Sequence, residues 1–220
     1  MRPMLLICVL FAVNACSLLV QPPDFTAQDV AAHRADGAPL PPACLPARTG
    51  ELVFNEILAK PAGVDLDGDG LSTGRDEALE LLYTGDAPGH LQGAQLLVDE
   101  HVRGVIGDAR CLQPGQLVVI TGSRTADVAL QPAAVQVRLS RPLELRDSGA
   151  ALRVVGVLAT DLGELTYPAA LPGQSWIRQS EGIREAPLIG HPAVGGRMHS
   201  IGTSALGRPA RPAAINPQQN

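Results

Sequence analysis

Residues 65–70 carry the most specific chemical pattern in the chain. They spell DLDGDG, so that Asp65, Asp67 and Asp69 stand at alternate positions and Gly70 follows them. This spacing matches the first half of an EF-hand-type calcium loop, in which alternate carboxylates converge on one hard cation and the glycine permits a sharp turn. The sequence therefore predicts that these three aspartates bind Ca²⁺.

The second half of such a loop supplies its ligands at positions seven and twelve. Position seven is Leu71, which offers its backbone carbonyl, and position twelve is Asp76, one methylene shorter than the usual glutamate. No helical pattern flanks the segment, so we expect a calcium loop between strands, with an affinity of about 10⁻⁴ to 10⁻³ M. The alternative is a solvated acidic turn, because Asp and Gly also favour turns for backbone reasons.

The other polar residues do not assemble into a catalytic pattern. The sequence contains no G-x-S-x-G elbow. Its five histidines lack the spacing of metal ligands, and we expect each to be a surface or core residue: His33, His90, His101, His191 and His199. We expect Glu56 and Glu80, which stand in apolar runs, to pair with arginines or to cap a sheet edge. These patterns predict a protein that is not an enzyme.

The N-terminus has the pattern of an export signal. Arg2 precedes ten apolar residues, Met4 to Val13, a run too short to cross a bilayer as a helix, which takes about 20 residues. Residues 13–16 (VNAC) resemble the lipobox of bacterial lipoproteins, in which the cysteine is acylated. We therefore expect residues 1–15 to be a signal peptide and Cys16 to carry a lipid anchor in the cell envelope. Ser17 favours the outer membrane. The alternative is a plain secretory signal cut before a chance cysteine.

Export has a consequence for the two remaining cysteines. Cys8 lies inside the signal and Cys16 is the lipid acceptor, which leaves Cys44 and Cys111. An even pair in an oxidising compartment predicts a disulfide. The alternative is two buried free thiols.

Composition limits the class of protein. Apolar residues make up 45% of the chain, enough for a packed core. Gly (23) and Pro (19) together are about a fifth of the 220 residues, which favours a turn-rich protein over a helical bundle. The net charge of −5 argues against nucleic-acid binding, which requires cationic surfaces that neutralise phosphates.

The apolar runs that must position these residues have the length and texture of strands. Short runs bounded by turn residues occur at 52–58, 78–83, 91–98, 101–106, 117–120, 135–139, 143–146, 151–157 and 174–179. The Asp-Ser-Gly turn at 147–149 predicts a hairpin between the runs at 143–146 and 151–157. No amphipathic crossover separates the runs, so we expect an all-β, antiparallel sandwich or barrel. We place it at residues 50–180, after a Pro/Ala-rich tether (16–49) and before a loop-rich extension (181–220).

The order of these runs resembles a known family. The segments LVFNEIL (52–58), DLDGDG (65–70), DEALEL (76–81), LQGAQL (91–96) and PGQLVV (114–119), with the 143–152 hairpin, look like the lamin-tail-type domain of secreted bacterial proteins. The resemblance covers roughly residues 50–180 and implies an immunoglobulin-like sandwich. It also implies a non-catalytic adhesion or interaction module, of a kind often attached to secreted nucleases or esterases.

Taken together, these patterns predict a non-catalytic lipoprotein of the cell envelope. Its partners would be the membrane, through the lipid, and an envelope protein whose identity the residues do not specify. The alternative function is an accessory domain or subunit of a secreted metal-dependent hydrolase or nuclease.

Overall fold

The computed structural model describes residues 44–122, 125, 128, 130 and 134–203. The predicted signal peptide, the acylated Cys16, most of the tether and the end of the extension lie outside the described residues. No helix in the described part of the chain combines the length and the apolar character needed to span a membrane.

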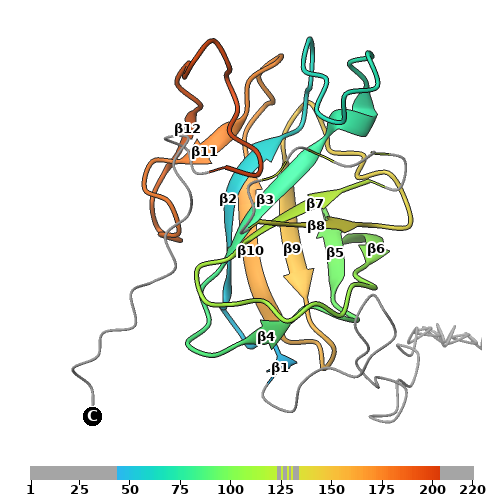
Figure 1. Ribbon diagram of the computed structural model, residues 1–220, viewed down its shortest axis with the longest axis vertical. Coiled ribbons are helices and arrows are strands. Elements are labelled where there is room, and N and C mark those ends of the chain that lie inside the picture. Colours follow the sequence, from blue (N-terminus) through green and yellow to red (C-terminus); the bar gives the residue numbers. More distant parts are fainter. Residues whose placement is uncertain (1–43, 123–124, 126–127, 129, 131–133, 204–220) are drawn as a thin grey trace, which may run out of the picture. The chain divides into compact units, whose positions relative to one another are not determined.

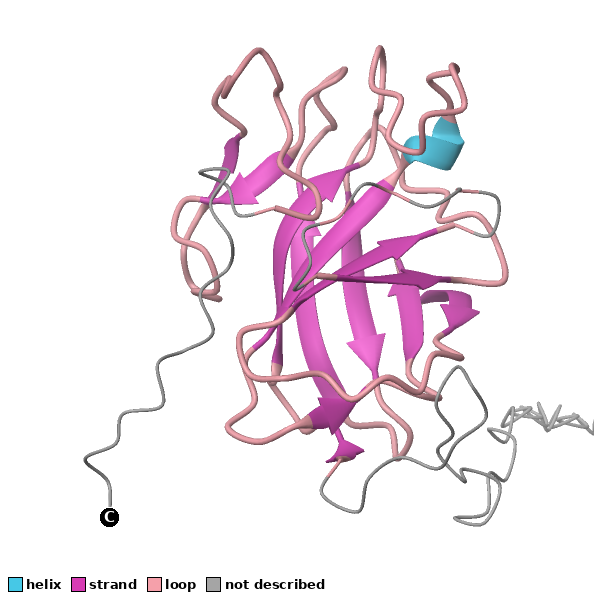
Figure 2. Cartoon of the chain, viewed as in Figure 1, coloured by secondary structure: helices cyan, strands magenta, loops and turns pink. Residues whose placement is uncertain are grey.

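The described residues form strands and one short 3₁₀ helix (Figure 2). The elements are β1 (Leu45–Pro46), β2 (Leu52–Leu58), η1 (Gly74–Asp76), β3 (Ala78–Tyr83), β4 (Gly89–His90), β5 (Gln95–Val98), β6 (His101–Val105), β7 (Leu117–Thr121), β8 (Val135–Arg138), β9 (Ala150–Val155), β10 (Asp161–Tyr167), β11 (Trp176–Arg178) and β12 (Leu188–Gly190).

Two main sheets make an all-β sandwich, which confirms the predicted fold class (Figure 1). One sheet has the strand order β12-β11-β2-β3-β7-β8 and the other β10-β9-β5-β6, while β1 and β4 form a small separate pair. Neighbouring strands are antiparallel within both sheets except for β7 and β8, which are parallel, as are β1 and β4.

The core lies between the two sheets and follows the period of two that a half-buried strand requires. Along β9 the residues alternate strictly between buried and half-buried. Leu79 and Leu81 of β3 face Leu96 of β5 and Leu152 of β9 within one continuous apolar cluster. Leucine and valine supply most of this cluster, as the scarcity of aromatic residues requires.

A glycine lets the two sheets approach each other along one side. A Cβ at Gly163 of β10 would stand 2.4 Å from the carbonyl oxygen of Leu52 in β2, a distance that no side chain tolerates. A backbone hydrogen bond from Gly50 to Asp161 (3.1 Å) lies beside this contact. Gly163 thus allows the edge strand of one sheet to pack against β2 of the other.

The predicted runs at 52–58 and 78–83 coincide with β2 and β3, whereas the predicted 143–157 hairpin is wrong. Leu143 and Leu145 are buried but belong to no strand, and Glu144 has a positive φ of 51°. The amide of Leu145 donates to the carboxylate of Glu77 (3.0 Å) instead of to a neighbouring strand. β9 pairs with β5 and with β10, a strand that the sequence pattern did not reveal.

The sandwich also extends beyond both predicted boundaries. β1 falls within the range expected to be tether, and its parallel pairing with β4 attaches it to the domain. β12 falls within the expected extension and pairs with β11. Two- and three-residue strands of this kind depend on their tertiary partners and leave too short a pattern to be recognised in sequence.

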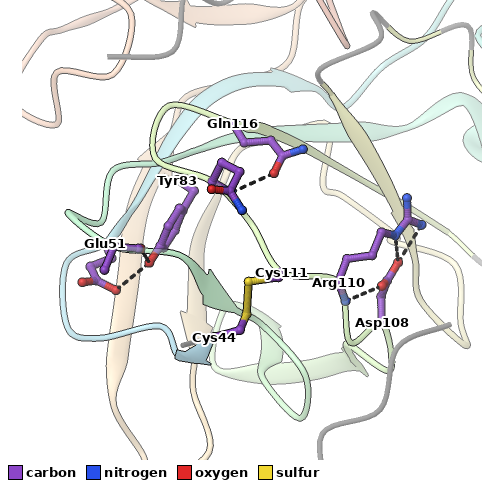
Figure 3. Close-up of a disulfide and its surroundings, with 9 residues drawn as sticks. Cys44, Glu51, Tyr83, Asp108, Arg110, Cys111 and Gln116 are labelled. Atoms are coloured by element: carbon purple, nitrogen blue, oxygen red, sulfur yellow. Dashed lines mark hydrogen bonds and ion pairs between the residues drawn. A yellow bond between two sulfur atoms is a disulfide. The ribbon is translucent and has the colours of Figure 1, made fainter. Parts of the chain in front are cut away.

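The predicted disulfide between Cys44 and Cys111 is present (Figure 3). Leu45, next to Cys44, pairs with Gly89 of β4, and Leu112, next to Cys111, forms an isolated bridge with the same glycine. The backbone on both sides of β4 therefore brings the two cysteines together, with a Cα–Cα distance of 5.8 Å that suits a disulfide.

Replacing both cysteines by alanine is expected to lower the free energy of unfolding by roughly 4 kcal/mol, because the bond closes a long loop in the unfolded chain. Urea unfolding of the wild type and of Cys44→Ala/Cys111→Ala measures the difference. A reducing agent should destabilise the wild type and leave the double variant unchanged. Equal midpoints for the two proteins would contradict a stabilising bond.

Candidate functional site

The acidic segment lies in the connection between β2 and β3, which are antiparallel neighbours. Leu58 and Ala78 are the register pair next to this connection, so residues 59–77 form a long hairpin loop. Figures 1 and 2 show this loop at one end of the strand pair, running into the short helix η1. The predicted position of the loop, between strands and without flanking α-helices, agrees with this arrangement.

Three of the predicted ligands come together in this loop. One carboxylate oxygen from each of Asp65, Asp67 and Asp76 lies within 4.8 Å of the others. Oxygen ligands bind Ca²⁺ at about 2.3–2.6 Å, so two ligands of one ion stand at most about 5 Å apart. The spacing is therefore compatible with a single calcium ion among them. In the described part of the chain this is the one group of three potential metal ligands.

The loop is folded by hydrogen bonds to its own carboxylates. The carboxylate of Asp65 accepts from the amides of Asp69 (3.1 Å) and Gly70 (2.9 Å), and Gly70 has the positive φ (84°) of a sharp turn. Asp76 accepts from the amide of Leu66 (2.7 Å) on one oxygen. Its other oxygen accepts from Thr73 (2.8 Å). These bonds alone account for an acidic turn, which is the alternative that the sequence left open.

Asp76 has a second role at the start of η1. Thr73 and Asp76 form a capping box, in which each side chain accepts a hydrogen bond from a backbone amide at the start of the helix. This explains why Asp76 is buried (1% exposed) while Asp65 is exposed. The cluster thus has one rigid, buried carboxylate and two that face solvent more openly.

The other two predicted ligands do not belong to this group of three. The carboxylate of Asp69 accepts from the amide of Leu71 (2.8 Å). The side chain of Leu71 is exposed. Asp69 and the Leu71 carbonyl stay predicted ligands.

Sequence patterns missed the buried carboxyl groups of the strands. Glu56 of β2 and Glu80 of β3 are partners in the strand register, and both are fully buried. Contrary to expectation, neither forms an ion pair with an arginine or lysine among the described residues. The only hint in the sequence was a charged residue inside each of two strongly apolar runs.

Glu77, the residue after η1, is a further buried acid. Burial raises the pKa of Glu77 to about 7, against the lowering effect of its hydrogen bond from the Leu145 amide. The negative charges of Asp147 and Glu144 add to the increase. Glu77 therefore ties the irregular 143–146 segment to the end of the acidic loop, and its carboxyl titrates close to neutral pH.

The described histidines stay separate from the acidic loop. His101 is exposed, whereas His90 and His191 are buried. Burial lowers the pKa of His90 and that of His199. His33 lies outside the described residues.

No family model matches this chain, and neither does any curated protein. The resemblance to lamin-tail-type domains therefore stays a prediction.

Glu77→Gln is expected to reduce the pH dependence of stability. Because folding raises this pKa from 4.5 to about 7, the folded state keeps a proton that the unfolded state loses. The resulting stabilisation is complete below pH 4.5 and is lost as the pH rises through 7. Glutamine still accepts the Leu145 amide but does not titrate.

Chemical unfolding at several pH values between 4.5 and 8 tests this expectation. Between the lowest and the highest pH, the free energy of unfolding should fall by on the order of 2 kcal/mol more in the wild type than in Glu77→Gln. Glu164→Gln, at an exposed position of β10, is the matched control and should follow the wild type. Parallel profiles for wild type and Glu77→Gln would show that Glu77 does not titrate as described.

Proposed function

We propose that the chain is an exported, lipid-anchored and non-catalytic β-sandwich module of the cell envelope, whose loop 65–76 binds Ca²⁺. The observation that carries the calcium proposal is the convergence of oxygens from Asp65, Asp67 and Asp76. The export and the anchor rest on the N-terminal sequence alone.

The chemistry of the loop favours calcium over softer metals. The three converging groups are all carboxylates, and hard oxygen ligands suit Ca²⁺ or Mg²⁺, whereas zinc and copper sites use nitrogen and sulfur. Ca²⁺ accepts six to eight ligands in flexible geometry, so the Asp69 carboxylate, the Leu71 carbonyl and water can complete the shell. Mg²⁺ demands a stricter octahedron, which an irregular hairpin loop does not favour.

Calcium would act on the loop mainly by neutralising its charge. Asp65, Asp67 and Asp69 lie close in sequence and repel one another while ionised. A bound cation replaces this repulsion by attraction and restrains the half-buried Asp67 and the exposed residues 68–72 against the buried Asp76. The ion would then stiffen the β2–β3 hairpin loop as a surface for an envelope partner.

The tether is long enough to lift the domain away from a membrane. The 27 residues from 17 to 43 separate Cys16 from Cys44, the first residue that the structure describes. A fully extended chain of this length reaches at most about 90–100 Å. A domain held in this way can contact partners at a distance from the lipid surface.

Calcium is expected to raise the melting temperature of the purified full chain. For a dissociation constant of about 10⁻⁴ to 10⁻³ M, an ion concentration of 10 mM stabilises the folded state by about 1.4–2.7 kcal/mol, or several degrees. Asp67→Asn should abolish most of this increase, because it removes one charge but keeps an oxygen that can accept the Asp69 amide (3.3 Å).

Differential scanning calorimetry with CaCl₂, MgCl₂ or EDTA measures the effect. Asp86→Asn, an exposed aspartate outside the loop, is the control and should respond like the wild type. A wild-type melting temperature indifferent to calcium would reject the ion. Mg²⁺-dependent hydrolysis of DNA or phosphodiesters by the chain would instead favour a role in a metal-dependent hydrolase or nuclease.

The anchor is tested separately in cells. Cys16→Ser is expected to move the protein from membrane fractions to the soluble exported fraction, because serine cannot take the thioether-linked lipid. Cys8→Ser, inside the apolar run of the signal, is the control and should stay with the membranes. Unchanged partitioning of Cys16→Ser, measured by fractionation and immunoblotting, would argue for a plain secretory signal.

A further inference from the structure

Glu56 and Glu80 lie on the face of the six-stranded sheet that is turned away from the main core. On β3 the flanking Leu79 and Leu81 belong to that core, and side chains alternate along a strand, so Glu80 points to the opposite side. Glu56 is its register partner on β2. Both side chains are nevertheless 0% exposed, so another part of the chain covers this face.

The cover is the C-terminal strap, which we define as residues 191–203. The strap follows β12 and is drawn in red beside β11 and β2 in Figure 1. Its Ile201 is buried against Leu58, Ala78 and Val119, one from each of three neighbouring strands. The apolar side chains in the strap's middle part, Val194 and Met198, are exposed. Ile201, near the end of the strap, thus provides its apolar contact with the sheet.

The carboxyl pair provides the polar attachment of the strap's end, whereas its earlier part is attached by backbone hydrogen bonds from His191 to Ser175 (2.9 Å) and from Ser175 to Met198 (3.0 Å). Ser200 donates to Glu56 twice, from its amide (2.7 Å) and from its hydroxyl (2.5 Å). The amide of Gly202 donates to Glu80 (2.7 Å). These contacts join residues 144 and 122 positions apart in the sequence. The pair is completed by Ser175, which donates to Glu56 (2.5 Å), and by Asn55, which donates to Glu80 (2.8 Å).

No arginine or lysine forms an ion pair with either carboxyl among the described residues. Burial raises the pKa of Glu56, although bonds from Ser175 and Ser200 and the nearby His191 act in the other direction. Burial also raises the pKa of Glu80, and the negative charge of Glu56 raises it further. The Glu181 charge acts on Glu80 in the same sense. The pKa of both carboxyls is therefore raised, that of Glu80 well above its usual value.

The strap carries titratable groups of its own. His191 is fully buried; its Nδ1 contacts the carbonyl of Pro192 (2.5 Å), and its Nε2 has no hydrogen-bond partner among the residues that the structure describes. Burial lowers the pKa of His199, and Arg197 and His191 lower it further. Because its pKa is lowered, His199 is neutral at alkaline pH, and its titration does not produce an opening there.

We propose that the C-terminal strap is a pH-sensitive latch, closed while the Glu56–Glu80 pair retains a proton and opened when both carboxyls ionise. The second ionisation would leave two like charges in a dry space without a counter-ion, and displacing Ser200, Ile201 and Gly202 admits water to both. A carboxyl whose pKa is raised in the closed form binds its proton more tightly there than in the open form. Protonation therefore stabilises the closed form at low pH, and this stabilisation is lost as the pH rises through the raised pKa. The latch adjoins the calcium loop, because Leu66 of that loop packs against the apolar cluster that contains Ile201.

Hydrogen exchange of the purified full chain, followed by mass spectrometry in EDTA, tests the proposal. After correction for intrinsic exchange rates, protection of residues 199–203 is expected to fall at least tenfold between about pH 6 and pH 9.5, while β9 stays protected. Glu80→Gln should keep the strap protected over the whole range, because glutamine accepts the Gly202 amide without acquiring charge. Glu164→Gln, at an exposed site, should behave like the wild type.

Two results would overturn the latch. One is a wild-type strap whose protection relative to β9 does not change with pH. The other is an opening in Glu80→Gln with the same pH dependence as in the wild type. If Glu80→Gln does not fold, the wild-type series decides by itself, because a pH-independent strap rejects the proposal without any variant. EDTA removes calcium, so calcium binding does not contribute to either result.

Discussion

The antiparallel pairing of β2 with β3 is the constraint on which the other features depend. Its register places Leu58 opposite Ala78, which sets the two ends of the acidic loop, and Glu56 opposite Glu80, which brings two carboxyls together. The same pair contributes Leu79 and Leu81 to the core on its other face. A shift of one residue would turn these leucines to the outer face and the carboxyl of Glu80 into the core, so burial on both faces specifies the register.

The two faces of this strand pair are stabilised by different forces. The inner face is apolar and packs against the four-stranded sheet. The outer face combines a small apolar cluster around Leu58 and Val119 with the buried carboxyl pair. An apolar outer face would attach the strap through non-directional contacts, whereas carboxyls bonded to particular backbone amides fix its position along the sheet. Specificity of position is gained at the cost of burying groups that prefer water.

The two ends of the sandwich are secured by different chemistry. At one end of β2, the β1–β4 pair and the Cys44–Cys111 bond join the start of the described domain to its middle (Figure 3). At the other end, the loop to β3 is organised by hydrogen bonds between aspartates and backbone amides. The first attachment is a covalent bond between two side chains, whereas the second consists of hydrogen bonds from backbone amides to carboxylates. The proposed calcium site and the proposed latch thus lie at the loop end and on the outer face beneath the strap.

Local signals in the sequence were sufficient for the fold class, for the limits of β2 and β3 and for the pairing of the last two cysteines. β2 and β3 are largely apolar runs bounded by turn residues, the DLDGDG spacing is a local pattern, and the expectation of export left Cys44 only Cys111 as a partner. Tertiary structure decided the rest. Leu143 and Leu145 look like a strand, but the buried carboxylate of Glu77 takes the Leu145 amide and holds the segment in irregular structure. The sequence around Glu56 and Glu80 does not reveal that they are buried, because Ser200 and Gly202, which cover them, lie more than a hundred residues away in the chain and reach them only in the folded protein.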